Sequence, residues 1–210
     1  MRGDRLTGLL LFLPVPLVLF LFTGQPLGPW ISLGAGVVIM LTHRLYARPF
    51  ALSRAHRRCL WCGGPAGDGP GVALEEPLGR TCWRACGASH AGLLARTLGW
   101  AAGRRLFLGV GILGTLALFL ALSVGVAAGQ AAGMEAADAT GVFRLGVALT
   151  VLPFGWLGPL TGPADGPKGR LPFPVHVQAL VGTLWVLWLF RLVGLWWLVA
   201  ALLHLARRVA

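Results

Sequence analysis

The sequence predicts an all-α integral membrane protein with about five transmembrane helices and one small cytoplasmic insert. Of its 210 residues, 56% are hydrophobic and only 12% are charged, and the mean hydropathy is +0.75. Soluble domains carry about 25% charged residues, so the composition excludes an ordinary soluble domain and a disordered chain. The apolar residues gather in long runs, and all four cysteines lie between the second and the third run.

The first 45 residues predict a transmembrane helical hairpin. Apolar runs cover residues 6–22 and 28–42, and the short uncharged turn between them contains Gly24 and Pro26. The basic start of the chain resembles a signal peptide, but no small-x-small cleavage site follows the first run. We therefore expect residues 1–45 to form a hairpin of two spans.

Residues 106–210 predict a membrane domain of two to three spans. The run 106–128 holds 23 uncharged residues, and about 20 are needed to cross the hydrocarbon core. The run 145–161 is rich in Pro and Gly in its second half, which predicts a kinked span or a re-entrant segment. The run 177–203 is rich in Trp and contains Arg191. We favour five spans, with the C-terminus outside; a re-entrant 145–161 would leave four.

The charge distribution predicts the orientation in a bacterial inner membrane. Residues 43–105 carry ten Arg and three acids, whereas residues 129–141 carry Glu135 and Asp138 and no base. The positive-inside rule therefore places the large loop in the cytoplasm and residues 129–141 outside. The net charge of +11 then reflects contact with anionic lipid, and we expect no nucleic-acid partner.

The insert, residues 46–105, carries the cysteines in a pattern typical of a metal site. Cys59 and Cys62 form a C-x2-C pair, Cys82 and Cys86 form a C-x3-C pair, and nineteen residues separate the two pairs. Two close pairs at this separation suit tetrahedral thiolate coordination of a structural zinc ion. A reducing cytosol keeps such thiols free; disulfides are the alternative if the topology is inverted.

The cysteine region also resembles a known module. Cys62-Gly63-x-Pro65 followed by the C-x3-C pair resembles treble-clef zinc modules, such as the small bacterial zinc protein that inhibits DNA gyrase, over residues 59–90 only. The resemblance implies a knuckle, a β-hairpin within residues 72–81 and a helix over residues 83–100. Thr81-Cys82-Trp83 departs from the family, which often has an aromatic residue, Cys and Ser. Treble clefs serve many functions, so this resemblance implies a metal and no particular task.

His90 is a further candidate ligand, because it follows Cys86 by four residues and shares its helical face. If it replaced one cysteine, a coordination position would open, as a catalytic zinc site requires. The alternative is a histidine on the helix surface near the metal.

Arg191 and Trp188 are the notable residues of the last run. A central intramembrane arginine costs about 2.5 to 3.5 kcal/mol on insertion scales, and no Asp or Glu lies inside any predicted span. Its partner must be a backbone carbonyl, a lipid head group, an anion or another chain. Trp188, deep in the same run, predicts packing on helices, quinone or lipid. His43 and His176, both near the cytoplasmic face, are candidate axial ligands of a haem.

No nucleophile elbow, H-E-x-x-H motif, phosphate loop or pair of intramembrane acids is present in the sequence. We therefore expect a non-enzymatic accessory, scaffolding or assembly subunit of a larger membrane complex. Its zinc module would dock a partner at the cytoplasmic face, and its partners would be the bilayer and other membrane subunits. The alternative is a redox or transport component that binds quinone, haem or anionic lipid around Arg191 and the Trp-rich last helix.

Overall fold

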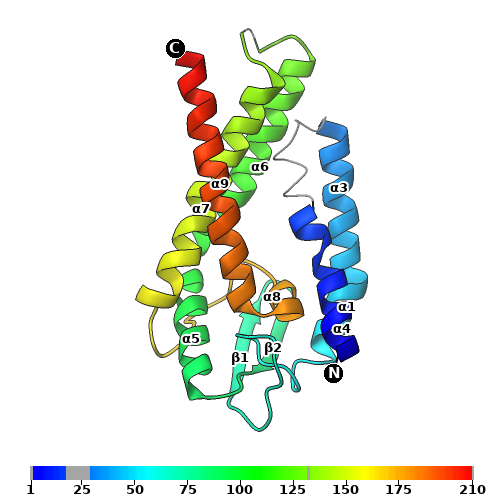
Figure 1. The fold of residues 1–210 in the computed structure, drawn as a ribbon, viewed down its shortest axis with the longest axis vertical. Helices are drawn as coiled ribbons and strands as arrows, with labels where there is room; N and C mark the ends of the chain where they lie inside the picture. The colour runs from blue at the N-terminus through cyan, green and yellow to red at the C-terminus, as the bar shows by residue number, and fades with distance from the viewer. Residues whose placement is uncertain (1, 18–28, 132, 210) are drawn as a thin grey trace.

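The computed structural model describes residues 2–17, 29–131 and 133–209. Long helices run along the molecule, and a small two-stranded sheet lies at one end of its long axis, close to the N-terminus and far from the C-terminus (Figure 1). The elements, in chain order, are α1 (Arg2–Phe12), α3 (Pro29–Thr42), the π-helix η1 (His43–Ala47), α4 (Arg48–Leu52), β1 (Gly71–Glu76), β2 (Gly79–Arg84), α5 (Ala88–Gly103), α6 (Arg105–Ala127), α7 (Ala136–Thr161), α8 (His176–Val181) and α9 (Thr183–Val209).

Three of the described helices, α6, α7 and α9, are long and apolar enough to cross a bilayer. Helix α6 coincides with the predicted run 106–128 to within one residue at each end. Only 11% of its most apolar window is buried inside the protein. Its remaining apolar surface faces outward, as a helix in contact with lipid requires.

Helix α7 begins nine residues before the predicted run 145–161. Glu135 and Asp138 form a capping box in which each side chain accepts a hydrogen bond from the other residue's backbone N–H. This box satisfies two of the amide groups that a helix start leaves free. The helix then continues through Pro153 and Pro159 to Thr161, so the structure has one long helix here and no re-entrant turn.

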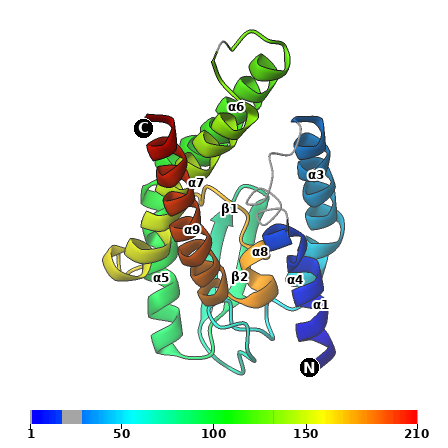
Figure 2. The same cartoon turned by 45° about the horizontal axis from the view of Figure 1, so that its top comes forward.

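The predicted run 177–203 is divided in two. Helix α8 ends at Val181, and Gly182, with φ of 107°, separates it from α9. That left-handed conformation favours glycine. The break redirects the chain, so α9 begins beside the sheet and runs to the opposite end of the molecule (Figures 1 and 2).

The predicted N-terminal hairpin lies partly outside the described residues. Helix α1 covers the first part of the run 6–22, and residues 18–28 are not described. Helix α3 covers the second run and continues through η1 into α4. Helix α1 packs on α8 and on η1, which brings the start of the chain to the same end as the sheet.

The insert holds the predicted hairpin, with longer strands than expected. Strands β1 and β2 pair antiparallel, with Leu74 opposite Thr81. The buried carboxylate of Glu76 accepts hydrogen bonds from Thr81 Oγ1 at 2.9 Å and from the Val175 N–H at 2.6 Å. The Leu171 N–H also donates to the Glu75 carbonyl at 2.8 Å. These bonds tie the segment before α8 to the edge of the sheet.

Two clusters of buried residues hold the helices together. The larger one surrounds Phe154 of α7, whose ring lies 5.5 to 6.0 Å, centre to centre, from those of Trp100, Phe173 and Phe190. The smaller one joins α6, α7 and α9 near their far ends, where Phe143 packs on Phe119 and on Trp197. Ring pairs at these separations add to the free energy of area burial.

Arg191 finds its partners within its own chain. Its Nε–H donates to the Gly155 carbonyl at 2.9 Å, and its guanidinium lies 4.7 Å from the ring centre of Trp156 and 4.9 Å from that of Trp188. In a regular helix the Gly155 carbonyl accepts from residue 159, but Pro159 has no N–H. Arg191 thus satisfies a carbonyl freed by a proline, and the rings of both tryptophans stabilise its charge.

A double-mutant cycle tests this pairing. Arg191→Leu leaves the Gly155 carbonyl unpaired, and we expect it to lower the free energy of unfolding by about 1 to 3 kcal/mol. Adding Pro159→Ala restores an N–H at position 159 and should recover part of that loss. Thermal unfolding of the purified protein in mild detergent measures both effects.

Pro153→Ala is the matched control, because the carbonyl freed by Pro153 belongs to Leu149 and not to Gly155. In the Arg191→Leu background it should recover less than Pro159→Ala does. Equal recovery by the two alanine variants would contradict the pairing.

Candidate metal centre

The first two ligands lie on a tight knuckle that precedes the hairpin. The Cys59 N–H donates to the Gly64 carbonyl, and the Gly63 N–H donates to the Cys59 carbonyl, both at 2.8 Å. Gly63 has φ of 71°, a left-handed conformation that a side chain would strain. The turn holds the sulfur atoms of Cys59 and Cys62 on the same side of the backbone.

The other two ligands lie at the start of helix α5. Strand β2 ends at Arg84, and Gly87 precedes the first residue of the helix. Cys86 lies just before the helix and His90 lies in its first turn, and the extended Gly87 joins them. Their separation, 2.9 Å from Cys86 Sγ to His90 Nδ1, shows that they point at one another.

One ligand atom from each of Cys59, Cys62, Cys86 and His90 lies within 4.8 Å of the other three. Cys62 Sγ is 4.0 Å from Cys86 Sγ, and Cys59 Sγ is 3.7 Å from His90 Nδ1. A tetrahedral zinc ion with Zn–S near 2.3 Å and Zn–N near 2.0 Å separates its sulfur ligands by about 3.8 Å and a sulfur from a nitrogen by about 3.5 Å. The four residues can therefore hold one metal ion with small adjustments.

The expected ligand set needs one correction, because Cys82 is not in this cluster. Cys82 lies in the middle of β2, where Thr81 and Trp83 are buried and Cys82 is exposed. Successive side chains of a strand point to opposite faces, so Cys82 points away from the core that its neighbours enter. His90 takes the fourth place, and the second pair is Cys86-x3-His90.

This exchange also changes the expected role of His90. It completes a group of four with three cysteines and leaves none of the four positions of a tetrahedron open. A signal for this arrangement was present in the sequence: Thr81-Cys82-Trp83-Arg84 alternates as a strand does, and a strand that reaches Arg84 turns Cys82 outward.

The thiols differ in how readily they ionise. Burial raises the pKa of Cys59, but hydrogen bonds from the backbone N–H groups of Cys62 and Cys86 outweigh this and lower it to about 7. Burial and the neighbouring Cys59 raise the pKa of Cys86 to about 11. Negative charges this close repel one another, and a divalent cation is what allows several thiolates to share one site.

The knuckle is joined directly to the start of α9. The Thr183 N–H donates to the Leu60 carbonyl at 2.8 Å, and the Leu184 N–H donates to the Trp61 carbonyl at 2.9 Å. The Thr183 hydroxyl lies 2.9 Å from the same Leu60 oxygen. The first amide groups of a helix have no partner within it, so the residues between Cys59 and Cys62 cap α9.

Two glycines permit this contact. A Cβ atom at Gly182 would lie 2.6 Å from the backbone nitrogen of Gly63, and one at Gly63 would lie 2.3 Å from the Val181 carbonyl oxygen. Arg58 closes the same junction, because its guanidinium donates to the carbonyls of Gly63 and Leu180 at 2.9 to 3.1 Å. The metal site and the α8–α9 break therefore form one structural unit.

The other predicted site residues lie elsewhere. Trp188 and Arg191 meet one another on α9, as described above, and not at the cysteine cluster. His43 and His176 are buried together with their ring centres 5.9 Å apart, edge to face. Burial, followed by the charges of His43 and Arg48, lowers the pKa of His176 to about 4, so this histidine is neutral at pH 7.

No protein-family model, curated protein or solved structure matches this chain.

Single substitutions distinguish the two ligand sets. Cys86→Ser and His90→Ala each remove a member of the cluster and should reduce bound zinc from about one ion per chain towards none. Cys82→Ser is the matched control and should keep its zinc, because Cys82 lies outside the cluster. Metal analysis of the purified variants provides the measurement, and loss of zinc in Cys82→Ser would restore the four-cysteine site.

The same proteins test the contact with α9. Without metal the knuckle loses its main restraint, so hydrogen exchange at the Thr183 and Leu184 amides should accelerate in Cys86→Ser. Amides in the middle of α6 should exchange as in the unaltered protein.

Proposed function

We propose that this chain is a non-enzymatic scaffolding or assembly subunit of a membrane complex, stiffened at its cytoplasmic face by one structural zinc ion. The observation that carries the proposal is the capping of α9 by the Leu60 and Trp61 carbonyls. Through this contact, metal binding on the knuckle determines the position and direction in which the long apolar helix α9 begins. A metal ion in this position has a structural role and not a catalytic one.

Zinc is the metal that suits the donor set best. Three thiolates and one imidazole are typical of structural zinc sites, which are closed, whereas catalytic zinc keeps a position for water or substrate. The order of knuckle, hairpin and helix, with ligands on the knuckle and at the helix start, supports a treble-clef-like module. An absorption spectrum checks this prediction, because a purified zinc protein is colourless whereas an iron protein would be coloured.

We further propose a multi-pass location in a bacterial inner membrane with the zinc module in the cytoplasm. Ten arginines in residues 43–105 favour the cytoplasmic side for the module. Helix α9 begins beside the module and ends at the far end of the molecule (Figure 1). Three spans by α6, α7 and α9 then place the C-terminus outside, and residues 1–45 would add two more.

The hairpin face that points away from the core supplies a surface for a partner. Arg80 and Cys82 are exposed there, and Leu78, at the turn, is 44% exposed. The zinc ion and the Glu76 hydrogen bonds hold this hairpin at a fixed height relative to α9. A docked protein would thus be fixed relative to the membrane.

The size of the native assembly tests the scaffolding role. Tagged chain expressed in its own host and extracted in mild detergent should migrate as a complex larger than the chain with its detergent. Cys86→Ser should be inserted but migrate mostly alone, whereas Cys82→Ser should keep the complex. A monomer in all three samples would contradict the proposal, even if zinc is bound.

Cysteine labelling tests the orientation independently. Cys82 is exposed and lies outside the metal cluster, so a membrane-impermeant maleimide should label it only after the cells are opened. A cysteine placed at Gln130, in the turn between α6 and α7, should be labelled in cells whose outer membrane alone is permeable. The reverse pattern would place the module outside.

A further inference from the structure

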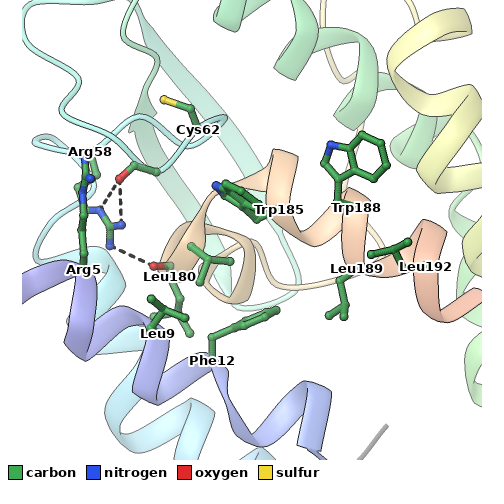
Figure 3. Close-up of a pocket in the computed structure, with 12 residues that line it drawn as sticks. Arg5, Leu9, Phe12, Arg58, Cys62, Leu180, Trp185, Trp188, Leu189 and Leu192 are labelled. Carbon is green, nitrogen blue, oxygen red and sulfur yellow. Dashed lines mark hydrogen bonds between the residues drawn. The ribbon is translucent and has the colours of Figure 1, made fainter. Parts of the chain in front are cut away.

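A groove of about 720 Å³ lies between helix α1 and the first turns of α9, next to the knuckle (Figure 3). This volume is within the range of small-molecule sites in proteins, about 300 to 1,000 Å³. Arg191 does not line the groove, but its ring partner Trp188 and the candidate metal ligand Cys62 both do. Its walls are cationic at one end and apolar along the rest of its length.

The end beside the knuckle is cationic. Arg5 of α1 and Arg58 both line it, and burial together with the nearby charge of Arg5 lowers the pKa of Arg58. The acid next in sequence, Asp4, is paired with Arg54 at 2.9 Å. Arg5 has no hydrogen bond or ion pair with any described residue, and no described lining residue is acidic. Asp4 also attracts Arg58, but it is shared with Arg54, so three arginines face one carboxylate and this end carries an excess of positive charge.

The rest of the groove is apolar and follows α9 away from the knuckle. Leu9 and Phe12 of α1 form one wall, and Trp185, Trp188 and Leu192 of α9 form the other (Figure 3). Trp185 is 61% exposed and Trp188 45% exposed, so both offer ring surface to a ligand. Because α9 leads from the module into a long apolar segment, charge and apolar surface are arranged as head and tail are in a lipid.

We propose that this groove binds one anionic phospholipid, with its phosphate at Arg5 and Arg58 and an acyl chain along Leu9, Trp185 and Trp188. Arginine forms charge-assisted hydrogen bonds with phosphate oxygens. Arg58 can donate to a phosphate without leaving its place, since three of its five N–H groups hold the carbonyls of Gly63 and Leu180. The inference rests on the proposed membrane location and not on the scaffolding role.

A neutral quinone fits these observations less well, because it gives the paired cations nothing to neutralise. A zwitterionic lipid carries its own ammonium group, which two arginines repel. The head group is therefore the feature that the groove distinguishes, and the test compares lipids that differ only there.

Mass spectrometry of the intact chain, released from detergent, counts retained lipids. We expect one phosphatidylglycerol per chain to be retained in preference to phosphatidylcholine of the same chain length. Arg5→Gln should weaken this retention by at least about tenfold, as expected for the loss of a charged hydrogen bond. Arg5 is the residue to change because removal of Arg58 would also loosen the knuckle.

Two further variants separate the groove from general surface charge. Arg44→Gln removes an exposed arginine outside the groove and should leave retention unchanged. Leu9→Trp narrows the apolar part without changing the charge and should also release the lipid. Zinc content confirms that each variant is folded.

The proposal is overturned if the two lipids are retained equally, or if Arg5→Gln behaves like Arg44→Gln. Lipid-free dimers in the mass spectrum would overturn it as well, because a second copy would then fill the groove. The labelling of Cys82 tests the membrane location separately, so failure of one inference is distinguishable from failure of the other.

Discussion

The close contact between the knuckle and the Gly182 break is the constraint on which the rest of the structure depends. The backbones approach so closely that a Cβ atom at either Gly63 or Gly182 would collide with the other segment. At this distance the carbonyls between Cys59 and Cys62 reach the free amides of α9. A segment near residue 60 thereby fixes the start of a helix that begins at residue 183, and a metal ion held by Cys59 and Cys62 would secure that segment.

Arg191 illustrates how a charge is accommodated without a carboxylate. The absence of any acid in the predicted spans suggests a partner outside the chain, yet the structure supplies a carbonyl that Pro159 leaves free. Gly155 eases the approach, since a Cβ there would lie 3.3 Å from Arg191 Cγ and the arginine side chain would have to shift slightly. Gly155 and Pro159 lie four residues apart in α7, and each alone would weaken the helix. Together they provide a free carbonyl that accepts a hydrogen bond from the guanidinium.

Composition and hydropathy predicted the apolar helices well, because long apolar runs have few alternatives to helix. Helix α6 was predicted almost to the residue. The start of α7 was missed because its first residues are polar, and a capping box rather than hydropathy determines where it begins. The break at Gly182 was missed because its cause, the backbone of Gly63, is distant in sequence. Strand periodicity decides between Cys82 and His90, and spacing alone cannot.

The metal centre and the lipid groove share the knuckle as a common wall. Cys62 belongs to the metal cluster, and both Cys62 and Gly63 line the groove. Arg58 contributes to both, because it holds the Gly63 carbonyl and also forms half of the cationic end. A metal-bound knuckle would keep Arg58 in place for a phosphate. Lipid binding should therefore depend on the metal, and since the affinities of two linked sites change reciprocally, a bound lipid should also strengthen metal binding.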